Sequence, residues 1–248
     1  MVGTLRFAHL MNFGGCSMTL QLFELVGTDA ARPFSPYCWR TRMALAHKGL
    51  DHASIPWRFT EKAAIAPHGS EKVPVLLHVD KSVAGSWEIA NYLEDHFPDR
   101  PSLFGGEGGR AAARMINSWG DIVVNGGMFP LIVSDIPAHL GAVDADYFRQ
   151  SREARLGRKL EEATAERDKS VIAFRRSLEP MRTTLRAQPY LGGIAPNYAD
   201  YIVFGGFQWA RVVSPFHLLA DDDPIHAWRE KLLDAFDGLA RKSPGFAV

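Results

Sequence analysis

A connector rich in proline and glycine, residues 98–109, separates two parts of the chain that differ in their hydrophobic pattern. The part before it, residues 19–97, alternates short apolar runs with two segments of helical spacing. After residue 110 the strand signals fade and helical spacing prevails. This change predicts a small α/β domain at 19–97, a linker at 98–109 and an all-helical domain at 110–248.

Three apolar runs in the first domain have the length and composition of strands. They read TLQLFELV, DHASIPW and VPVLLHV, and each is rich in residues that favour strands. A turn at Asp80-Lys81 leads into a short fourth strand that ends at Gly85. Residues 58–72 are polar and are expected to be irregular.

Capping residues and helical spacing predict the helices. Ser35-Pro36 begins a helix over 36–48, because serine is a preferred N-cap and proline is favoured at the first helical position. Ser86 is expected to cap a helix that ends near residue 96. The spacing of apolar residues in the second domain predicts helices at 110–134, 144–188 (bent), 197–213 and 224–240.

Composition and charge exclude several classes of protein. The chain has 28 Lys+Arg against 28 Asp+Glu, so it lacks the basic excess that nucleic-acid binding or a polybasic membrane anchor requires. No apolar run of about 18 residues is present to span a bilayer. Cys16 and Cys38 are too few for a disulfide framework, which predicts a cytoplasmic protein. Residues 1–18 are expected to be a flexible extension; a targeting segment and a true start at Met18 remain alternatives.

Familiar metal and hydrolase motifs are missing from the sequence. The nine histidines form neither HxxxH nor HExxH, no GxSxG occurs, and the glycine clusters at 105–109 and 205–206 lack a strand–turn–helix context. No metal site is therefore expected.

Three short features in the first domain share one chemical theme. Ser35 and Ser86 each place a hydroxyl at a helix N-terminus, where free N–H groups favour an anion. Pro74 opens a strand, and a cis Val73-Pro74 bond would present the backbone of Val73 to an extended ligand. Each feature alone is also explained as an ordinary cap or strand start.

Cys38 lies one helical turn after Ser35. It could be a reactive thiol assisted by Arg42, or a packed core residue among its aromatic neighbours; the second interpretation is favoured.

The order of these motifs resembles that of the glutathione transferases. The segments are SPYCWRTRMALAHKGL, KVPVLL, GSWEIANYLEDHFPDRPSLFGG and YLGGIAPNYADY. The resemblance implies an α/β thioredoxin-like N-terminal domain, with a cis-proline before its third strand, followed by an all-α C-terminal domain. It also implies that Asn197 and Asp200 form a structural capping box.

Within that family, Ser-Pro-Tyr-x-Trp followed by Arg-Thr-Arg is most similar to the bacterial β-aryl-etherases and the fungal fuA-type enzymes, both serine-type. DRPSLFGG and DDDPIHAWREKLLDAFDGL agree with this. This likeness implies that a homodimer uses glutathione to attack an aryl ether or another electrophilic, hydrophobic aromatic substrate, as in the cleavage of lignin-derived aromatics or in detoxification.

The resemblance also implies roles for individual residues. Ser35 would hydrogen-bond the glutathione sulfur and favour the thiolate. Val73 would pair its backbone with the cysteinyl unit, a contact that Pro74 makes available. Ser86 would hold the γ-glutamyl carboxylate at a helix end.

One position departs from the family pattern. An acidic residue usually precedes that serine and meets the γ-glutamyl ammonium, whereas this chain has Gly85. Glu88, another side chain or a partner subunit would have to supply the charge; otherwise glutathione would bind weakly. The candidates for the glycyl carboxylate are Lys72 and, as a second choice, Arg40.

Aromatic and apolar residues are candidates for the second-substrate pocket, although at helical spacing they suit a core equally well. The candidates are Trp39, Trp119, Met128, Phe129 and Phe207, with Tyr201, Phe204 and Trp209 as further options. Two other functions stay open: a non-catalytic protein of this fold that binds aromatic ligands, and a glutathione thiol transferase based on Cys38.

Overall fold

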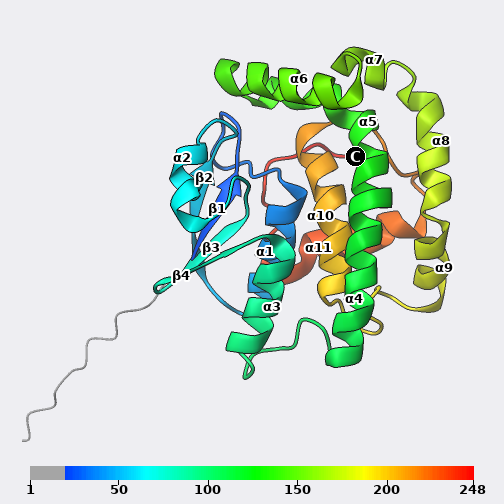
Figure 1. Cartoon of the computed structure of the whole chain (residues 1–248). Helices are drawn as coiled ribbons and strands as arrows, with labels where there is room; N and C mark the ends of the chain where they lie inside the picture. The colour runs from blue at the N-terminus through cyan, green and yellow to red at the C-terminus, as the bar shows by residue number, and fades with distance from the viewer. Residues whose placement is uncertain (1–19) are drawn as a thin grey trace, which may run out of the picture.

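The computed structural model describes residues 20–248, so the predicted extension at residues 1–18 lies outside the described residues. A small sheet with its helices lies beside a larger all-helical part (Figure 1). The predicted fold class, an α/β domain followed by an all-helical domain, is therefore confirmed.

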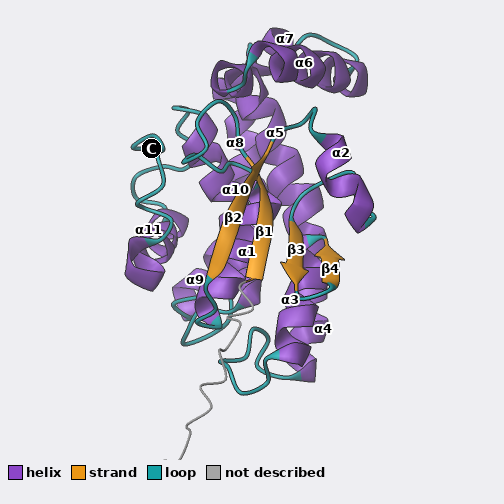
Figure 2. Cartoon of the chain, turned by 90° about the vertical axis from the view of Figure 1, so that its left-hand side faces the viewer, coloured by secondary structure: helices purple, strands orange, loops and turns teal. Residues whose placement is uncertain are grey.

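The sheet has four strands in the order β2-β1-β3-β4 (Figure 2). These are β1 (Leu20–Leu25), β2 (His52–Trp57), β3 (Val75–His78) and β4 (Lys81–Ala84). β1 pairs in parallel with β2 and antiparallel with β3, which pairs antiparallel with β4. Leu22 faces Leu76 across the β1–β3 pair, and both are fully buried, so apolar alternation fixes this register.

Three helices complete the first domain: α1 (Pro36–His47), α2 (Lys62–Ile65) and α3 (Ser86–His96). The expectation that 58–72 is irregular is wrong in part, because α2 and a 3₁₀ turn (Ala66–His68) lie there; a four-residue helix is too short to show a helical period. The N-cap of α3 is Gly85, with φ +96°, and not Ser86 as predicted, so Ser86 is the first helical residue.

The helical domain begins with a nearly continuous rod. α4 (Glu107–Trp119) runs through a π-helical segment (Gly120–Asn125) into α5 (Gly126–Ile132), close to the helix predicted at 110–134. A 3₁₀ segment (Val133–His139) follows.

The single bent helix expected at 144–188 is wrong, because four helices occupy that region. They are α6 (Ala142–Leu156), α7 (Leu160–Thr164), α8 (Arg167–Ser177) and α9 (Glu179–Ala187). Gly157, with φ +67°, ends α6 in the left-handed conformation that glycine adopts at little cost. The breaks between these four helices are only a few residues long, so the helical spacing of apolar residues continues across them and predicts a single helix.

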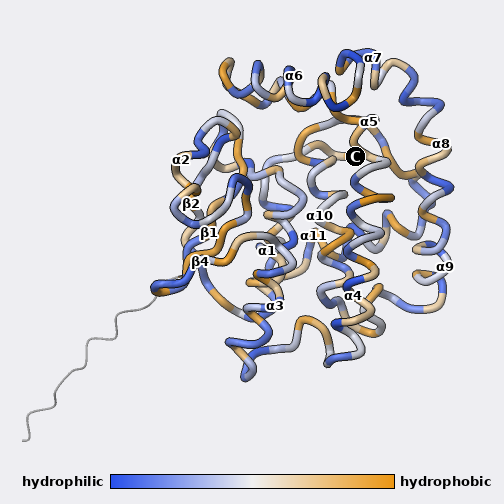
Figure 3. Tube along the Cα trace, in the orientation of Figure 1, coloured by the Kyte–Doolittle hydropathy of each residue, from blue (hydrophilic) through white to orange (hydrophobic). Residues whose placement is uncertain are grey.

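The core of the second domain is α10 (Tyr198–Val213), of which every residue except Arg211 is buried. α11 (Pro224–Gly238) packs beside it, close to the helix predicted at 224–240. The predicted Asn197–Asp200 capping box is present. The outer helices α8 and α9 carry long hydrophilic stretches (Figure 3).

α1 packs directly on α10, and this contact holds the two domains together. A methyl group at Gly205 of α10 would collide with the carbonyl oxygen of Pro36, so only glycine lets α1 begin where it does. The packing thereby fixes the position of Ser35, one residue before Pro36.

Among the residues that the structure describes, no helix is long and apolar enough to cross a membrane.

Candidate active site

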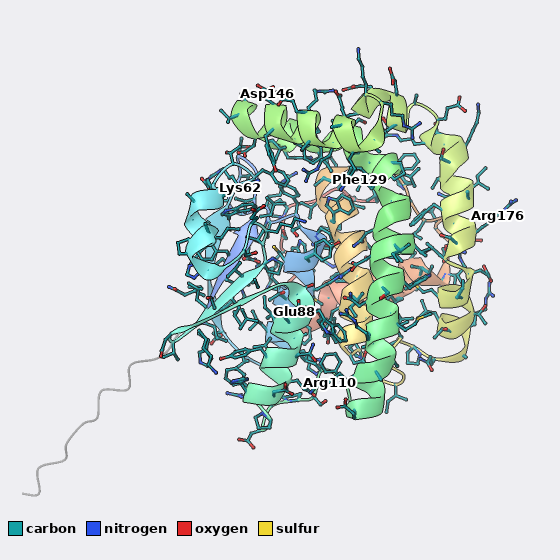
Figure 4. All side chains as sticks on the ribbon, in the orientation of Figure 1. Lys62, Glu88, Arg110, Phe129, Asp146 and Arg176 are labelled. Carbon is teal, nitrogen blue, oxygen red and sulfur yellow. The ribbon has the colours of Figure 1, made fainter. Side chains whose placement is uncertain are left out.

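A cavity of about 690 Å³ lies between the two domains. The sheet domain contributes Ser35, Lys72 and Val73 to its wall, and the helical domain contributes residues of the π-helical segment, α5 and α6. Lys62 on α2 and Phe129 on α5 lie on opposite sides of this region, with α6 above them (Figure 4).

Ser35 combines a helix N-terminus with access to this cavity. Its Oγ accepts a hydrogen bond from the Cys38 N–H (3.3 Å), and its side chain is only 4% exposed. In the described part of the chain, Ser35 Oγ donates to no oxygen or nitrogen acceptor, and the Cys38 thiol is the protein group that interacts with it. The hydroxyl is thus oriented by the helix, and its proton remains available to an anion in the cavity.

The Val73-Pro74 peptide bond is cis, as the resemblance implied. Pairing of β3 with β1 begins only at Val75, so the backbone of Val73 lies outside the ladder and at the cavity wall. Gly85 N–H donates to the Pro74 carbonyl (3.0 Å), which places the start of α3 directly beside this bond. Ser35 and Val73 therefore share one cavity wall, and the start of α3 adjoins Pro74, whereas Ser86 itself does not line the cavity.

Ser86 and Glu88, the residues considered for the two charged ends of the γ-glutamyl group, lie in the first turn of α3. Ser86 is 5% exposed, and its carbonyl oxygen accepts the Tyr198 hydroxyl (2.7 Å). The Glu88 carboxylate folds back against Gly85, so that a methyl group added at Gly85 would collide with it. Glu88 is exposed and labelled in Figure 4. The negative charge missing from position 85 is thus present within one turn of it.

Of the two cations considered for the glycyl carboxylate, only Lys72 lines the cavity. Arg40 is fully buried and donates to the Ile202 carbonyl (3.0 Å), Asn117 Oδ1 (3.2 Å) and Asp121 Oδ1 (2.8 Å). These contacts contradict the expectation that Arg40 binds glutathione, because its guanidinium already joins α1 to the helical domain.

Most of the aromatic and apolar residues predicted for the pocket belong to the core. Trp39 is fully buried, with its Nε1 on the Pro33 carbonyl (2.9 Å), and Phe207 packs against Trp228. Met128 is also fully buried. Trp119 packs against the core and does not line the cavity. These four predictions are wrong, because α1, α4, α5 and α10 direct these side chains into the core and away from the cavity.

Phe129 lines the cavity and stacks on Trp209 (ring centroids 6.3 Å apart), which was a further option from the sequence and also lines the cavity. Sequence reasoning missed further rings of the wall: Phe34 and Phe59 come from loops, Trp57 ends β2, and Tyr147 and Phe148 come from α6.

Asn125, the last residue of the π-helical segment, adds a polar group that the sequence did not reveal. It lines the cavity, is 8% exposed, and neither atom of its amide has a hydrogen-bond partner among the described residues. Its carboxamide packs against Gly206, where a methyl group would not fit. π-Helical turns recur at functional sites, and this one turns an unused amide toward the cavity.

Tyr37 shares this part of the wall. Burial, and then the charge of Asp121, raise the pKa of its phenol. The Tyr37 hydroxyl therefore stays protonated and does not act as a base in the cavity.

Cys38 is packed in the core, fully buried, one turn beyond Ser35. Burial raises the pKa of its thiol to about 12, and the charge of Glu24 acts in the same direction. Because the thiolate is the reactive form, the structure favours the interpretation of Cys38 as a core residue.

We expect the native protein and its Cys38→Ser variant to release the same amount of chromophore from Ellman's reagent. At mildly alkaline pH the thiolate fraction of Cys38 is about 10³-fold below that of an exposed cysteine, and the thiol is also inaccessible. Unfolding in denaturant serves as the control and must reveal one additional thiol in the wild type. A rapidly titrating extra thiol in the native wild type would restore the thiol-transferase alternative.

Within residues 20–248, no group of three or more His, Cys, Asp or Glu side chains is arranged to hold a metal ion.

Comparison with known proteins gives a consistent result. The family model "Glutathione S-transferase, N-terminal domain" matches residues 34–96, and "Glutathione S-transferase, C-terminal domain" matches residues 111–232. The "Probable glutathione S-transferase GSTU1" of Oryza sativa subsp. indica is 34% identical over 97 residues, which span 36% of this chain and 42% of the rice protein. "Glutathione S-transferase U28" of Arabidopsis thaliana is 23% identical over 209 residues, 81% of each chain.

Two solved fungal structures share the fold. The glutathione transferase GSTFuA3 from Phanerochaete chrysosporium matches with a TM-score of 0.79 and 23% identity, over 89% of this chain and 96% of that one. A glutathione S-transferase of Ceriporiopsis subvermispora, solved in complex with glutathione, gives 0.78 and 22%, over 88% and 96%. At this identity the likeness concerns the fold.

Proposed function

The chain belongs to the glutathione S-transferase family, and on this premise we propose that it ionises glutathione at Ser35 and transfers the thiolate to an electrophilic aromatic compound. The observation that carries the proposal is the Ser35 hydroxyl, held at the N-terminus of α1 with its proton free toward a cavity of substrate size. Measuring glutathione conjugation to 1-chloro-2,4-dinitrobenzene tests it: turnover is expected, and its absence would favour the non-catalytic alternative.

Ser35, the N-terminus of α1 and the aromatic wall of the cavity each assist one part of the proposed reaction. The thiol loses its proton to solvent, and the sulfur anion accepts the Ser35 O–H and faces the positive end of α1. The thiolate then attacks an electrophilic carbon held against the aromatic wall; the carbon–sulfur bond forms, and the leaving group departs with its electron pair. Holding both reactants in one cavity supplies much of the rate.

The contacts of glutathione follow from the same geometry. We assign the cysteinyl backbone to Val73, the γ-glutamyl carboxylate to Ser86 at the start of α3, and the glycyl carboxylate to Lys72. The folded-back carboxylate of Glu88 supports its assignment to the γ-glutamyl ammonium in place of an acidic residue at Gly85.

Replacing Glu88 with glutamine is expected to raise the Kd for glutathione about three- to fivefold, because an exposed ion pair contributes modestly. Calorimetry measures it, and an analogue of glutathione without the amino group must bind both proteins equally. Glu107→Gln, at the start of the neighbouring helix α4, is the matched control and should change nothing. Equal affinity of glutathione for wild type and Glu88→Gln would remove Glu88 from the site.

The finer parts of the proposal concern the second substrate and the assembly. Rings of the wall and a cavity of about 690 Å³ support an aromatic electrophile, including an aryl ether as in the β-etherases. We also propose a cytoplasmic homodimer. The exposed apolar side chains of Met115 and Ile122, 66% and 75% accessible on the α4 rod, support a partner surface there.

A further inference from the structure

Helix α6 forms the outer wall of the cavity, and one face of it carries two arginines. Phe148, Arg152 and Arg155 lie three and four residues apart, so they share a face, and all three line the cavity. None of these three residues was a candidate from the sequence. The spacing that places an aromatic residue and two arginines on one side was the available signal.

Both guanidinium groups lie over aromatic rings of the cavity wall. The Arg152 guanidinium is 4.7 Å from the centroid of the Phe148 ring and 5.1 Å from that of Phe59. The Arg155 guanidinium is 4.4 Å from the centroid of the Phe129 ring. Stacking holds the planar groups in place and leaves their N–H edges available to an acceptor.

Neither Arg152 nor Arg155 pairs with a carboxylate within the described part of the chain. Among the described residues, Arg152 donates to Ser151 Oγ (2.9 Å), and the Tyr147 hydroxyl also interacts with its guanidinium. Arg149, on the same helix but outside the cavity, is by contrast paired with Glu153 (2.8 Å) and Glu161 (2.7 Å). Among the arginines of α6, the two that line the cavity are therefore the ones with no carboxylate partner among the described residues.

The charges around them do not supply that anion. Lys62 and Lys72 are further cations of the wall, and its carboxylates are Glu71 and Asp121, of which Asp121 pairs with Arg40. Burial, and then the charge of Arg155, lower the pKa of Arg152, which is the signature of two cations that repel each other in a partly desolvated place.

The structure assigns this pair to the second substrate: we propose that the electrophile is an aromatic acid whose carboxylate binds between Arg152 and Arg155. A guanidinium fork matches a carboxylate, and the rings beneath suit an arene. The inference rests on the proposed transferase function. The anchors assigned to glutathione belong to the sheet domain, whereas α6 belongs to the helical domain across the cavity, which favours the electrophile over glutathione as the occupant.

Two matched arenes test the proposal: 4-chloro-3-nitrobenzoate and the neutral 4-chloro-3-nitrobenzamide. In each, the thiolate forms a bond to the ring carbon that carries chlorine, and chloride leaves with the electron pair. The quantity to compare is the ratio of kcat/KM for the benzoate to kcat/KM for the benzamide, in wild type and variants, because the ratio cancels intrinsic reactivity.

We expect the Arg152→Ala/Arg155→Ala double variant to lower this ratio at least tenfold through the KM of the benzoate. Its KM for glutathione and its turnover of the benzamide should stay within about twofold. Arg149→Ala, the control from the same helix, should leave the ratio unchanged. An unchanged ratio in the double variant, or a loss that falls on the KM of glutathione, would overturn the proposal; the second result would make the arginines part of the glutathione site.

Binding without turnover separates this inference from the proposed function. If the wild type conjugates neither arene, the transferase proposal fails, and calorimetry of 3-nitrobenzoate and 3-nitrobenzamide without glutathione still tests the arginines. Preference for the benzoate that disappears in the double variant supports them as an anion site; equal affinity for the two compounds in wild type refutes it.

Discussion

Replacing Ser35 with alanine is expected to lower kcat/KM for glutathione conjugation by about 10²- to 10³-fold, the usual effect of removing one hydrogen-bond donor from a developing or stored anion. Ser35 Oγ receives the Cys38 N–H and keeps its own proton for the sulfur, so the substitution removes the donor that faces the thiolate. The pH profile of kcat/KM should also move to higher pH, because the bound thiol would ionise less readily.

Two companion variants separate this chemistry from helix capping. Loss of the N-cap in Ser35→Ala also destabilises the protein by about 1 kcal/mol, whereas glycine at an N-cap costs only a few tenths. Ser35→Gly should therefore be as inactive as Ser35→Ala at nearly wild-type Tm, and Ser35→Thr should retain measurable activity. Retention of kcat/KM within about threefold in Ser35→Ala, less than about 0.7 kcal/mol in the barrier, would show that Ser35 is not the activating group.

Replacing Asp200 with alanine is expected to lower the free energy of unfolding by about 4 kcal/mol. The carboxylate is fully buried and accepts four hydrogen bonds: from the N–H groups of Leu191 (2.7 Å), Gly192 (2.9 Å) and Asn197 (3.1 Å), and from Trp228 Nε1 (2.8 Å). Each unpaired buried donor costs about 1–3 kcal/mol. For a chain of this size the loss corresponds to a Tm about 8–16 °C lower.

Asn197→Ala is the graded control for this measurement. It removes the side-chain acceptor of the Ala199 N–H (2.9 Å) and of the Asp200 N–H in the capping box, and should cost about 1 kcal/mol. Thermal unfolding followed by circular dichroism compares the three proteins. If Asp200→Ala and Asn197→Ala had the same Tm, the hydrogen bonds of the Asp200 carboxylate to the loop before α10 and to Trp228 of α11 would not contribute to stability.

The sheet-domain side of the site could be predicted because its signals are local. A Ser-Pro pair before a helical pattern marks the N-terminus of α1 wherever the helix packs, and Val73-Pro74 marks the start of β3. Ser35, Val73 and Lys72, all candidates from the sequence, line one cavity.

The helical side could not be predicted in the same way, because it depends on packing between distant segments. Arg40 looks like an exposed cation in the sequence, yet α10 covers it and brings the Ile202 carbonyl to its guanidinium. The side chain of Trp39, on α1, is buried in the protein core, whereas Phe59, from a loop, lines the cavity. Which charges of α6 face inward is decided by where that helix crosses the cavity, a long-range property that spacing alone does not determine.

The most direct measurement is a calorimetric titration of the wild-type protein with reduced glutathione near neutral pH, in two buffers that differ in ionisation enthalpy. Free glutathione enters mainly as the thiol, since a cysteine thiol has a pKa of about 8.5, so ionisation at Ser35 must release a proton to the buffer. We expect a Kd between micromolar and low millimolar, release approaching about one proton for each glutathione bound, and much smaller release in Ser35→Ala. Binding without proton release, or no binding at several millimolar glutathione, would contradict thiolate formation at Ser35.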